Sequence, residues 1–213
     1  EEEMEQRLRL AQEIMRIDPD DPFALLTVSY YAYLSENHTL CRELYERYIT
    51  LYPEDAAGWN NLALSYKRTG EYVKEENLYR VALAIEPNNS NTKNNLAVNL
   101  ARQGKYDEAH GLMGQLDLQP EEVPYAELHR AKIAASQGRD RRAYRHIKKA
   151  LSLVDRMDTF HHIEFRQDIR IDPSFRRLRS QVKFRQLLRD TYGDQSPLVI
   201  GQNRPQDGRL ADG

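Results

Sequence analysis

The clearest pattern in the sequence runs from Ala56 to Asn89 and reads AAGWNNLALSYKRTGEYVKEENLYRVALAIEPNN. Trp59 and Tyr66 lie seven residues apart with apolar residues between them at helical spacing, which predicts one buried helix face. Gly70 interrupts this pattern, a second helical stripe follows, and Pro87 with two asparagines ends it. The stretch therefore predicts two helices joined by a tight turn within 34 residues.

The same pattern returns at steps of 34 residues in both directions, which is the signature of a repeat array. The residues at equivalent positions are Leu25, Val28, Ser29, Ala32, Cys41, Tyr45, Tyr48 and Pro53 one step earlier; Leu96, Ala97, Leu100, Gly104, Tyr106, Ala109 and Met113 one step later; and, more loosely, Ala131, Ala134, Gly138, Ala143, Ile147, Ala150 and Leu151 two steps later.

The period and the residues at its fixed positions resemble the tetratricopeptide repeat. Two departures stand out. Small residues other than glycine occupy a packing position of the first helix in three units, and Glu75 replaces a small residue in the second helix of the best unit. The residues that carry the resemblance are Trp59, Leu62, Tyr66, Tyr79 and Pro87.

The resemblance implies an all-α, right-handed superhelical solenoid of helix-turn-helix repeats. We predict the second helix of a partial repeat over 1–21, four repeats over 22–155, a C-terminal helical cap over 156–193, and a disordered tail over 194–213. The repeats are placed at 22–55, 56–89, 90–121 and 122–155. The tail is rich in Gly, Pro, Gln and Asp.

In the family, the first helix of each hairpin lines the concave side, and the function it implies is a non-catalytic scaffold or adaptor that holds an extended peptide or partner protein there. The side chains that this arrangement turns towards a partner are Tyr30, Tyr33, Asn60, Asn61, Leu64, Lys67, Arg68, Asn94, Asn95, Val98, Arg102, His129 and Lys132.

Paired asparagines recur one period apart, as Asn60-Asn61 and Asn94-Asn95. Asparagine is a poor residue for a helix interior, because its side chain competes for backbone hydrogen bonds. Its amide offers a donor and an acceptor, so a ladder of asparagines can bind the backbone of an extended chain whatever its sequence. The alternative is that these asparagines bridge neighbouring helices or face solvent, and both interpretations stay open.

Positive charge follows the same side of the predicted solenoid, at Lys67, Arg68, Arg102 and Lys132. Such side chains suit carboxylate groups on a bound peptide. Tyr30 and Tyr33 could form a pocket wall of the kind common at binding hot spots, or could pack between repeats.

The charge is distributed unevenly along the chain. Residues 1–129 carry 12 Lys and Arg against 23 Asp and Glu, a net −11, while residues 130–190 carry 17 against 7, a net +10. One interpretation is that both regions are solvated helix faces. The alternative is that the acidic part of one copy meets the basic end of another, which would make the chain an assembly module. The basic end has little aromatic interleaving, which argues against nucleic acid as the partner.

Catalytic and metal motifs are absent from the sequence, so we predict no enzyme activity, no cofactor and no metal site. A third hypothesis is that the chain is the targeting arm of a larger enzyme.

The sequence contains no run of 18 apolar residues that could span a bilayer, and the lone Cys41 allows no internal disulfide. These features favour the cytoplasm. Because the sequence begins with Glu1 and not Met, we expect a fragment or processed product, and a periplasmic or anchored protein stays open.

Overall fold

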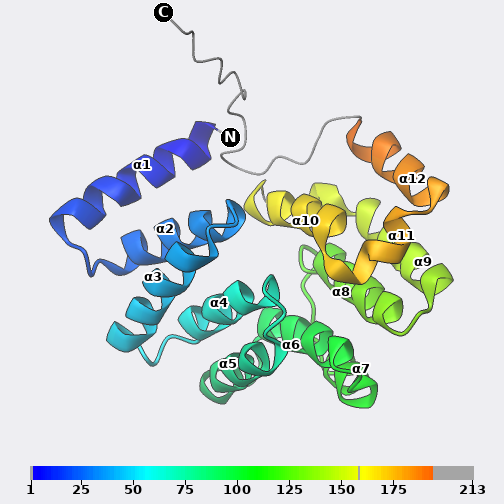
Figure 1. Cartoon of the computed structure of the whole chain (residues 1–213), viewed down its shortest axis with the longest axis horizontal. Helices are drawn as coiled ribbons and strands as arrows, with labels where there is room; N and C mark the ends of the chain where they lie inside the picture. The colour runs from blue at the N-terminus through cyan, green and yellow to red at the C-terminus, as the bar shows by residue number, and fades with distance from the viewer. Residues whose placement is uncertain (1, 158, 194–213) are drawn as a thin grey trace, which may run out of the picture.

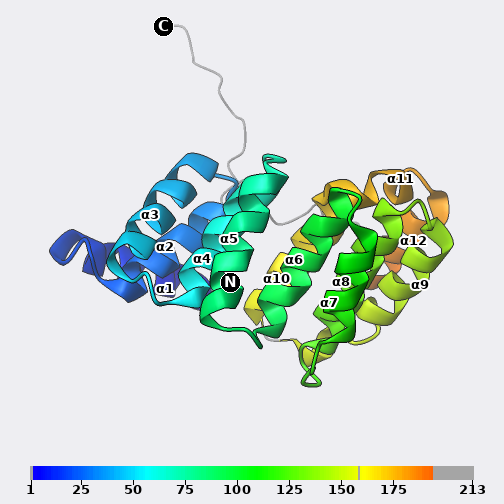
Figure 2. The same cartoon turned by 90° about the horizontal axis from the view of Figure 1, so that it is seen from below.

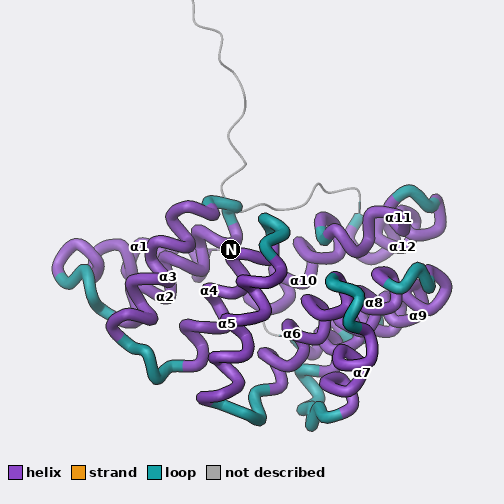
Figure 3. The backbone as a smooth tube through the Cα atoms, turned by 60° about the horizontal axis from the view of Figure 1, so that its bottom comes forward, coloured by secondary structure: helices purple, strands orange, loops and turns teal. Residues whose placement is uncertain are grey.

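The computed structural model describes residues 2–157 and 159–193, and over these residues it contains helices and no strand (Figure 3). In chain order the α-helices are α1 (Glu2–Ile17), α2 (Pro22–Leu34), α3 (His38–Leu51), α4 (Ala56–Lys67), α5 (Tyr72–Ile85), α6 (Ser90–Arg102), α7 (Tyr106–Gly114), α8 (Val123–Ser136), α9 (Asp140–Leu151), α10 (Thr159–Ile171), α11 (Arg176–Arg179) and α12 (Val182–Tyr192), with short 3-10 helices at Val154–Arg156 and Pro173–Phe175. None of the described helices is long and apolar enough to cross a bilayer.

Local sequence explains where the hairpins begin and turn. Asp21 accepts a hydrogen bond from the Ala24 backbone N–H at 2.8 Å and so caps α2, and aspartate or asparagine caps α3, α4 and α6 in the same way. The turns inside the hairpins have positive φ at positions 34 residues apart, namely Glu36 (59°), Gly70 (74°), Gly104 (80°) and Gly138 (76°). Glycine adopts this conformation without a Cβ clash, so three of the four turns carry it.

The helices α2 to α9 form four antiparallel hairpins that stack into an arc (Figure 1). The first helices of the hairpins, α2, α4, α6 and α8, lie on the inner side of the arc, and α3, α5, α7 and α9 lie on the outer side. Figure 2 shows the same stack from below. The chain is thus an all-α superhelical solenoid, as the resemblance implied.

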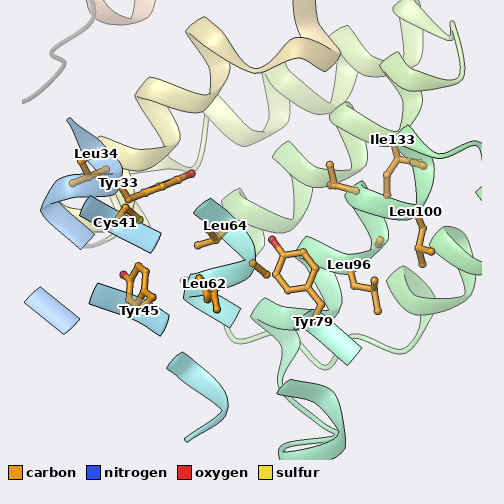
Figure 4. Close-up of a cluster of buried hydrophobic side chains, with 14 of the residues drawn as sticks. Tyr33, Leu34, Cys41, Tyr45, Leu62, Leu64, Tyr79, Leu96, Leu100 and Ile133 are labelled. Atoms are coloured by element: carbon orange, nitrogen blue, oxygen red, sulfur yellow. The ribbon is translucent and has the colours of Figure 1, made fainter. Parts of the chain in front are cut away.

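Two hydrophobic cores stabilise the array. The first runs from α1 to α8 and contains Tyr33, Tyr45, Leu62, Tyr79 and Leu96, several of which are drawn in Figure 4. The second joins α8 and α9 to the C-terminal helices through Leu128, Ile147, Phe165, Phe175 and Phe184, and other residues of these elements. Burial of this apolar surface, repeat against repeat, provides the main driving force for folding.

The segment after residue 155 differs from a single cap over the last repeat. The helices α11 and α12 do contact α9, but a break at Ser180-Gln181 separates them. The helix α10 lies on the inner side of the arc, between α2 and α8 (Figure 1). The predicted disordered tail over 194–213 lies outside the described residues.

Candidate partner-binding groove

The inner side of the solenoid is divided into a filled part and an open part. The filled part holds α10 and the turn that follows it, and the open part is a hollow of about 380 Å³ towards α1 and α2. The side chains predicted from sequence to contact a partner are distributed between these two parts and the core beneath them.

Carboxylates of the chain itself neutralise the predicted row of cations. Lys67 Nζ lies 3.0 Å and Arg68 Nη2 3.1 Å from the carboxylate of Asp168, and Lys132 also binds it. Arg102 Nη2 lies 2.7 Å from Asp172 Oδ2. All of these side chains are at most 7% exposed. In this structure the row therefore binds carboxylates of the chain itself.

The two carboxylates are held ionised. Burial would raise the pKa of Asp168, but the adjoining Lys132, Lys67 and Arg68 outweigh it and hold the pKa well below its usual range. The pKa of Asp172 is also well below its usual range, because Arg102 and Lys132 overcome the effect of burial. The cluster is a buried network of four cations and two anions.

Further contacts fix α10 across the array. Gln167 Nε2 donates to the Leu34 carbonyl at 3.1 Å, and Tyr30 Oη donates to Glu164 Oε2 at 3.3 Å. Phe165 and Ile169 of the same helix belong to the second core. The helix α10 thus contacts α2, more than 100 residues away in the sequence, as well as its neighbour α8.

The predicted asparagines form a ladder, but it lies mostly inside the protein. The amide groups of Asn60 and Asn61 are 3.1 Å apart, and those of Asn60 and Asn95 are 3.2 Å apart. His129 Nε2 continues the series at 3.1 Å from the Asn95 amide, and its Nδ1 lies 2.7 Å from the Tyr125 carbonyl oxygen. The ladder bridges α4, α6 and α8, and only Asn61 is more than slightly exposed.

Three predicted side chains face the core and are not available to a partner. Tyr33 is 1% exposed with the Arg68 guanidinium 5.6 Å from its ring centre, and Val98 is 3% exposed within the first core. Asn94 is also 3% exposed. For these residues the prediction that they line an accessible groove is wrong, because the inner helices are wrapped closely by their neighbours.

The open hollow collects the remaining predicted residues, Tyr30, Asn61, Leu64 and Asn95. Its other walls come from α1, α2, α6, α8 and α10, and sequence reasoning missed those of α1 and α10. The residues of these other walls are Arg7, Leu26, Thr27, Tyr31, Asn91, Tyr125, His161 and Glu164.

A sequence signal for α10 did exist. Between residues 159 and 193 the acidic residues are Glu164, Asp168, Asp172 and Asp190, and the first three are four residues apart in an otherwise basic segment. Residues four apart share a helix face, so this spacing marks an acidic stripe. The stripe is the complement of the basic row on α4, α6 and α8.

Comparison with known proteins agrees with the stack of helical hairpins. The tetratricopeptide repeat family model matches residues 44–77, which span the end of α3, the whole of α4 and the start of α5. The match covers one repeat length and supports the tetratricopeptide repeat family for this chain. No curated protein sequence matches the chain.

Solved tetratricopeptide structures share the fold. MamA AMB-1 is 24% identical with a TM-score of 0.53, and the match covers 72% of this chain and 90% of that one. Another crystal structure of MamA is 16% identical with a TM-score of 0.52, over 70% and 86% of the two chains. YrrB, described as a TPR protein with an unusual peptide-binding site, is 14% identical with a TM-score of 0.50, over 78% and 84%. The tetratricopeptide repeat is an interaction fold, so the chain has the architecture of a protein-interaction scaffold.

Proposed function

We propose that this chain is a non-catalytic scaffold that binds a segment of a partner protein in the open hollow of the concave side. The observation that carries the proposal is the hollow itself, where apolar walls from Leu26 and Leu64 meet the polar groups of Asn61 and Asn91. A concave, mainly apolar site with a few placed polar groups is the usual form of a recognition site. The similarity to YrrB, a TPR protein with a peptide-binding site, supports the same reading.

The site is shorter than the groove that sequence predicted. The helix α10 and its ion pairs fill the part above α4, α6 and α8, so a bound segment would contact α1, α2, α4, α6 and the flank of α10. The partner would therefore touch repeat helices and the C-terminal region together.

Site-specific photo-cross-linking tests this proposal. A p-benzoylphenylalanine at Asn91, which is exposed and lines the hollow, is compared with one at Val73, which is 66% exposed on α5. We expect the first alone to capture a defined partner segment from native lysate, and a synthetic copy of that segment to block the capture. Equal capture at both positions, or none at Asn91, would contradict the proposal.

A second function, self-association, is favoured by the exposed charge of α9. Arg141, Arg142, Arg145, Lys148 and Lys149 are all exposed on it, while α1 exposes Glu2, Glu3, Glu5 and Glu13. The acidic end of one copy could meet the basic end of another. Light scattering at 50 mM and 500 mM salt would detect such an assembly, and the double substitution R141E/R145E should dissociate it into monomers. A monomer at both salt concentrations rejects it.

A further inference from the structure

The ladder of asparagines has a direction, and that direction decides which group it presents at the hollow. An amide oxygen and an amide nitrogen occupy equivalent positions, so the hydrogen-bond partners determine which is which. If Asn60 Nδ2 donates to Asn61 and Asn95 Nδ2 donates to Asn60, the Asn95 oxygen faces His129. His129 would then have to donate from both ring nitrogens, which requires an imidazolium.

The surroundings of His129 exclude the imidazolium at neutral pH. The side chain is 1% exposed, and burial together with the nearby Lys132 lowers its pKa to about 3. The ring is therefore neutral and carries one N–H. Nδ1 lies 2.7 Å from the Tyr125 carbonyl oxygen, which can only accept, so the proton is on Nδ1 and Nε2 is an acceptor.

This assignment propagates along the ladder. Asn95 must turn its NH₂ to His129 Nε2 and its carbonyl to Asn60. Asn60 then donates to Asn95 and offers its own carbonyl to Asn61. Asn61 donates to Asn60, and its carbonyl oxygen is the group that remains at the hollow. Each buried amide and ring nitrogen in the ladder thereby has a complementary partner.

The polar wall of the hollow therefore presents two acceptors. Besides the Asn61 carbonyl it contains the Glu164 carboxylate, which is 8% exposed and already accepts from Tyr30. Arg7 also lines the hollow, with its guanidinium 5.4 Å from the ring centre of Phe23. Leu26 and Leu64 provide apolar surface beside these acceptors.

We propose that the hollow binds a lysine or arginine side chain of the partner, with its stem on Leu26 and Leu64 and its cationic head between the Asn61 carbonyl and the Glu164 carboxylate. This inference rests on the proposed function and names the chemistry that the site selects. A long cationic side chain can bury its methylene stem on apolar surface while its head finds polar partners.

Capped pentapeptides Ac-Gly-Gly-X-Gly-Gly-NH₂, with lysine, norleucine or glutamate at X, are the probes. Binding is followed by NMR through the side-chain amide signals of Asn61 and Asn95. We expect lysine to bind at least tenfold more tightly than norleucine, which has a similar stem and no charge, and glutamate to cause no shift. Equal affinities for lysine and norleucine, a preference for glutamate, or no binding of the lysine peptide would overturn the proposal.

Two further measurements test the ladder itself. Asn61→Leu should reduce lysine binding to the norleucine level, whereas Asn88→Leu, an exposed asparagine outside the hollow, should leave it within twofold. The ¹⁵N shifts of His129 at pH 7 should show the Nδ1–H form, and they need no substitution. The Nε2–H form would overturn the assignment.

A partner segment captured at Asn91 that contains no lysine or arginine would contradict this inference, while it would still support the proposed function.

Discussion

Asp168 is the residue on which the inner side of the solenoid converges. It accepts from Lys67, Arg68 and Lys132, and its side chain is completely buried. Removing charges from water costs several kcal/mol per ion, and only close pairing with good geometry compensates for that cost. The cluster is therefore sensitive to the loss of any one member.

The substitution Asp168→Asn should lower the free energy of unfolding by about 3–5 kcal/mol, because it leaves buried cations without their anion. Urea denaturation followed by circular dichroism measures this. The control is Glu71→Gln, which removes more exposed ion pairs with Lys74 at 2.7 Å and Arg42 at 2.9 Å and should cost much less. Similar effects of both substitutions would contradict the buried-network interpretation.

His129 predicts a pH dependence of stability. Its folded pKa of about 3 is below the unfolded value of about 6.5, so between these values the unfolded chain binds the extra proton. Stability should consequently fall as pH is lowered through 6.5, with a slope approaching about 1.4 kcal/mol per pH unit for this group. Asp168 and Asp172, whose pKa values are depressed, add a further loss below about pH 4.

Urea titrations at pH 7.5, 6.5, 5.5 and 4.5 test this, with His129→Gln as the comparison. The variant should have a lower unfolding free energy at pH 7.5. Between pH 6.5 and 4.5, however, the slope of its unfolding free energy against pH should be smaller by the contribution of about one bound proton. His38 and His162, whose pKa values burial also lowers, will keep some slope in both proteins. An unchanged slope in the variant would rule out His129 as its source.

At the scale of the elements, one close contact joins successive hairpins. Gly58 of α4 faces Tyr48 of α3, and a Cβ built at Gly58 would lie 2.6 Å from the Tyr48 ring atom Cδ1. The Tyr48 hydroxyl is itself tied to Asp55, the cap of α4. The absence of a side chain at Gly58 therefore sets how closely α4 approaches α3.

Gly58→Ala should lower the unfolding free energy by about 1–3 kcal/mol, because overpacking outweighs the gain in helix propensity. Gly111→Ala in α7 is the matched control, since a Cβ there meets no atom within 4 Å. That substitution should stabilise the protein by about 0.5–1 kcal/mol. Thermal and urea unfolding of the two variants should shift in opposite directions, and a stabilised Gly58→Ala would disprove the close packing.

At the scale of the whole molecule, α10 joins parts of the array that lie far apart in the sequence. Repeat proteins ordinarily transmit stability only between neighbouring units. Here Lys67 and Arg68 bind a carboxylate about 100 residues later in the chain, and Gln167 reaches the Leu34 carbonyl. The two hydrophobic cores are thereby joined across the inner side as well as along the arc.

The double substitution D168N/D172N should uncouple the two ends of the array. Trp59, the only tryptophan, reports on α4, while circular dichroism reports on all helices. In the wild-type chain we expect both signals to give one coincident urea transition, and in the double variant two separated transitions. Coincidence in both proteins would show that contacts along the arc suffice for cooperativity.

The helical hairpins could be predicted from the amino-acid sequence alone. Their boundaries follow from local chemistry: asparagine and aspartate caps, helical apolar spacing, and a positive φ at Gly70, Gly104 and Gly138, one period apart. Such signals act within one or two helical turns, and they recur from repeat to repeat. The basic row on the inner helices was also predicted, because a period of 34 places equivalent side chains on one side.

What occupies that side depends on contacts between segments that are distant in the sequence. The docking of α10 depends on contacts such as those of Arg68 and Asp168, which periodicity cannot pair because α10 lies outside the repeat. The same folding turned Asn60 and Asn95 into an internal ladder and left Asn61 at its open end. Local patterns fix which residues form helices, but the complementarity of charge and shape between distant segments fixes which surface remains for a partner.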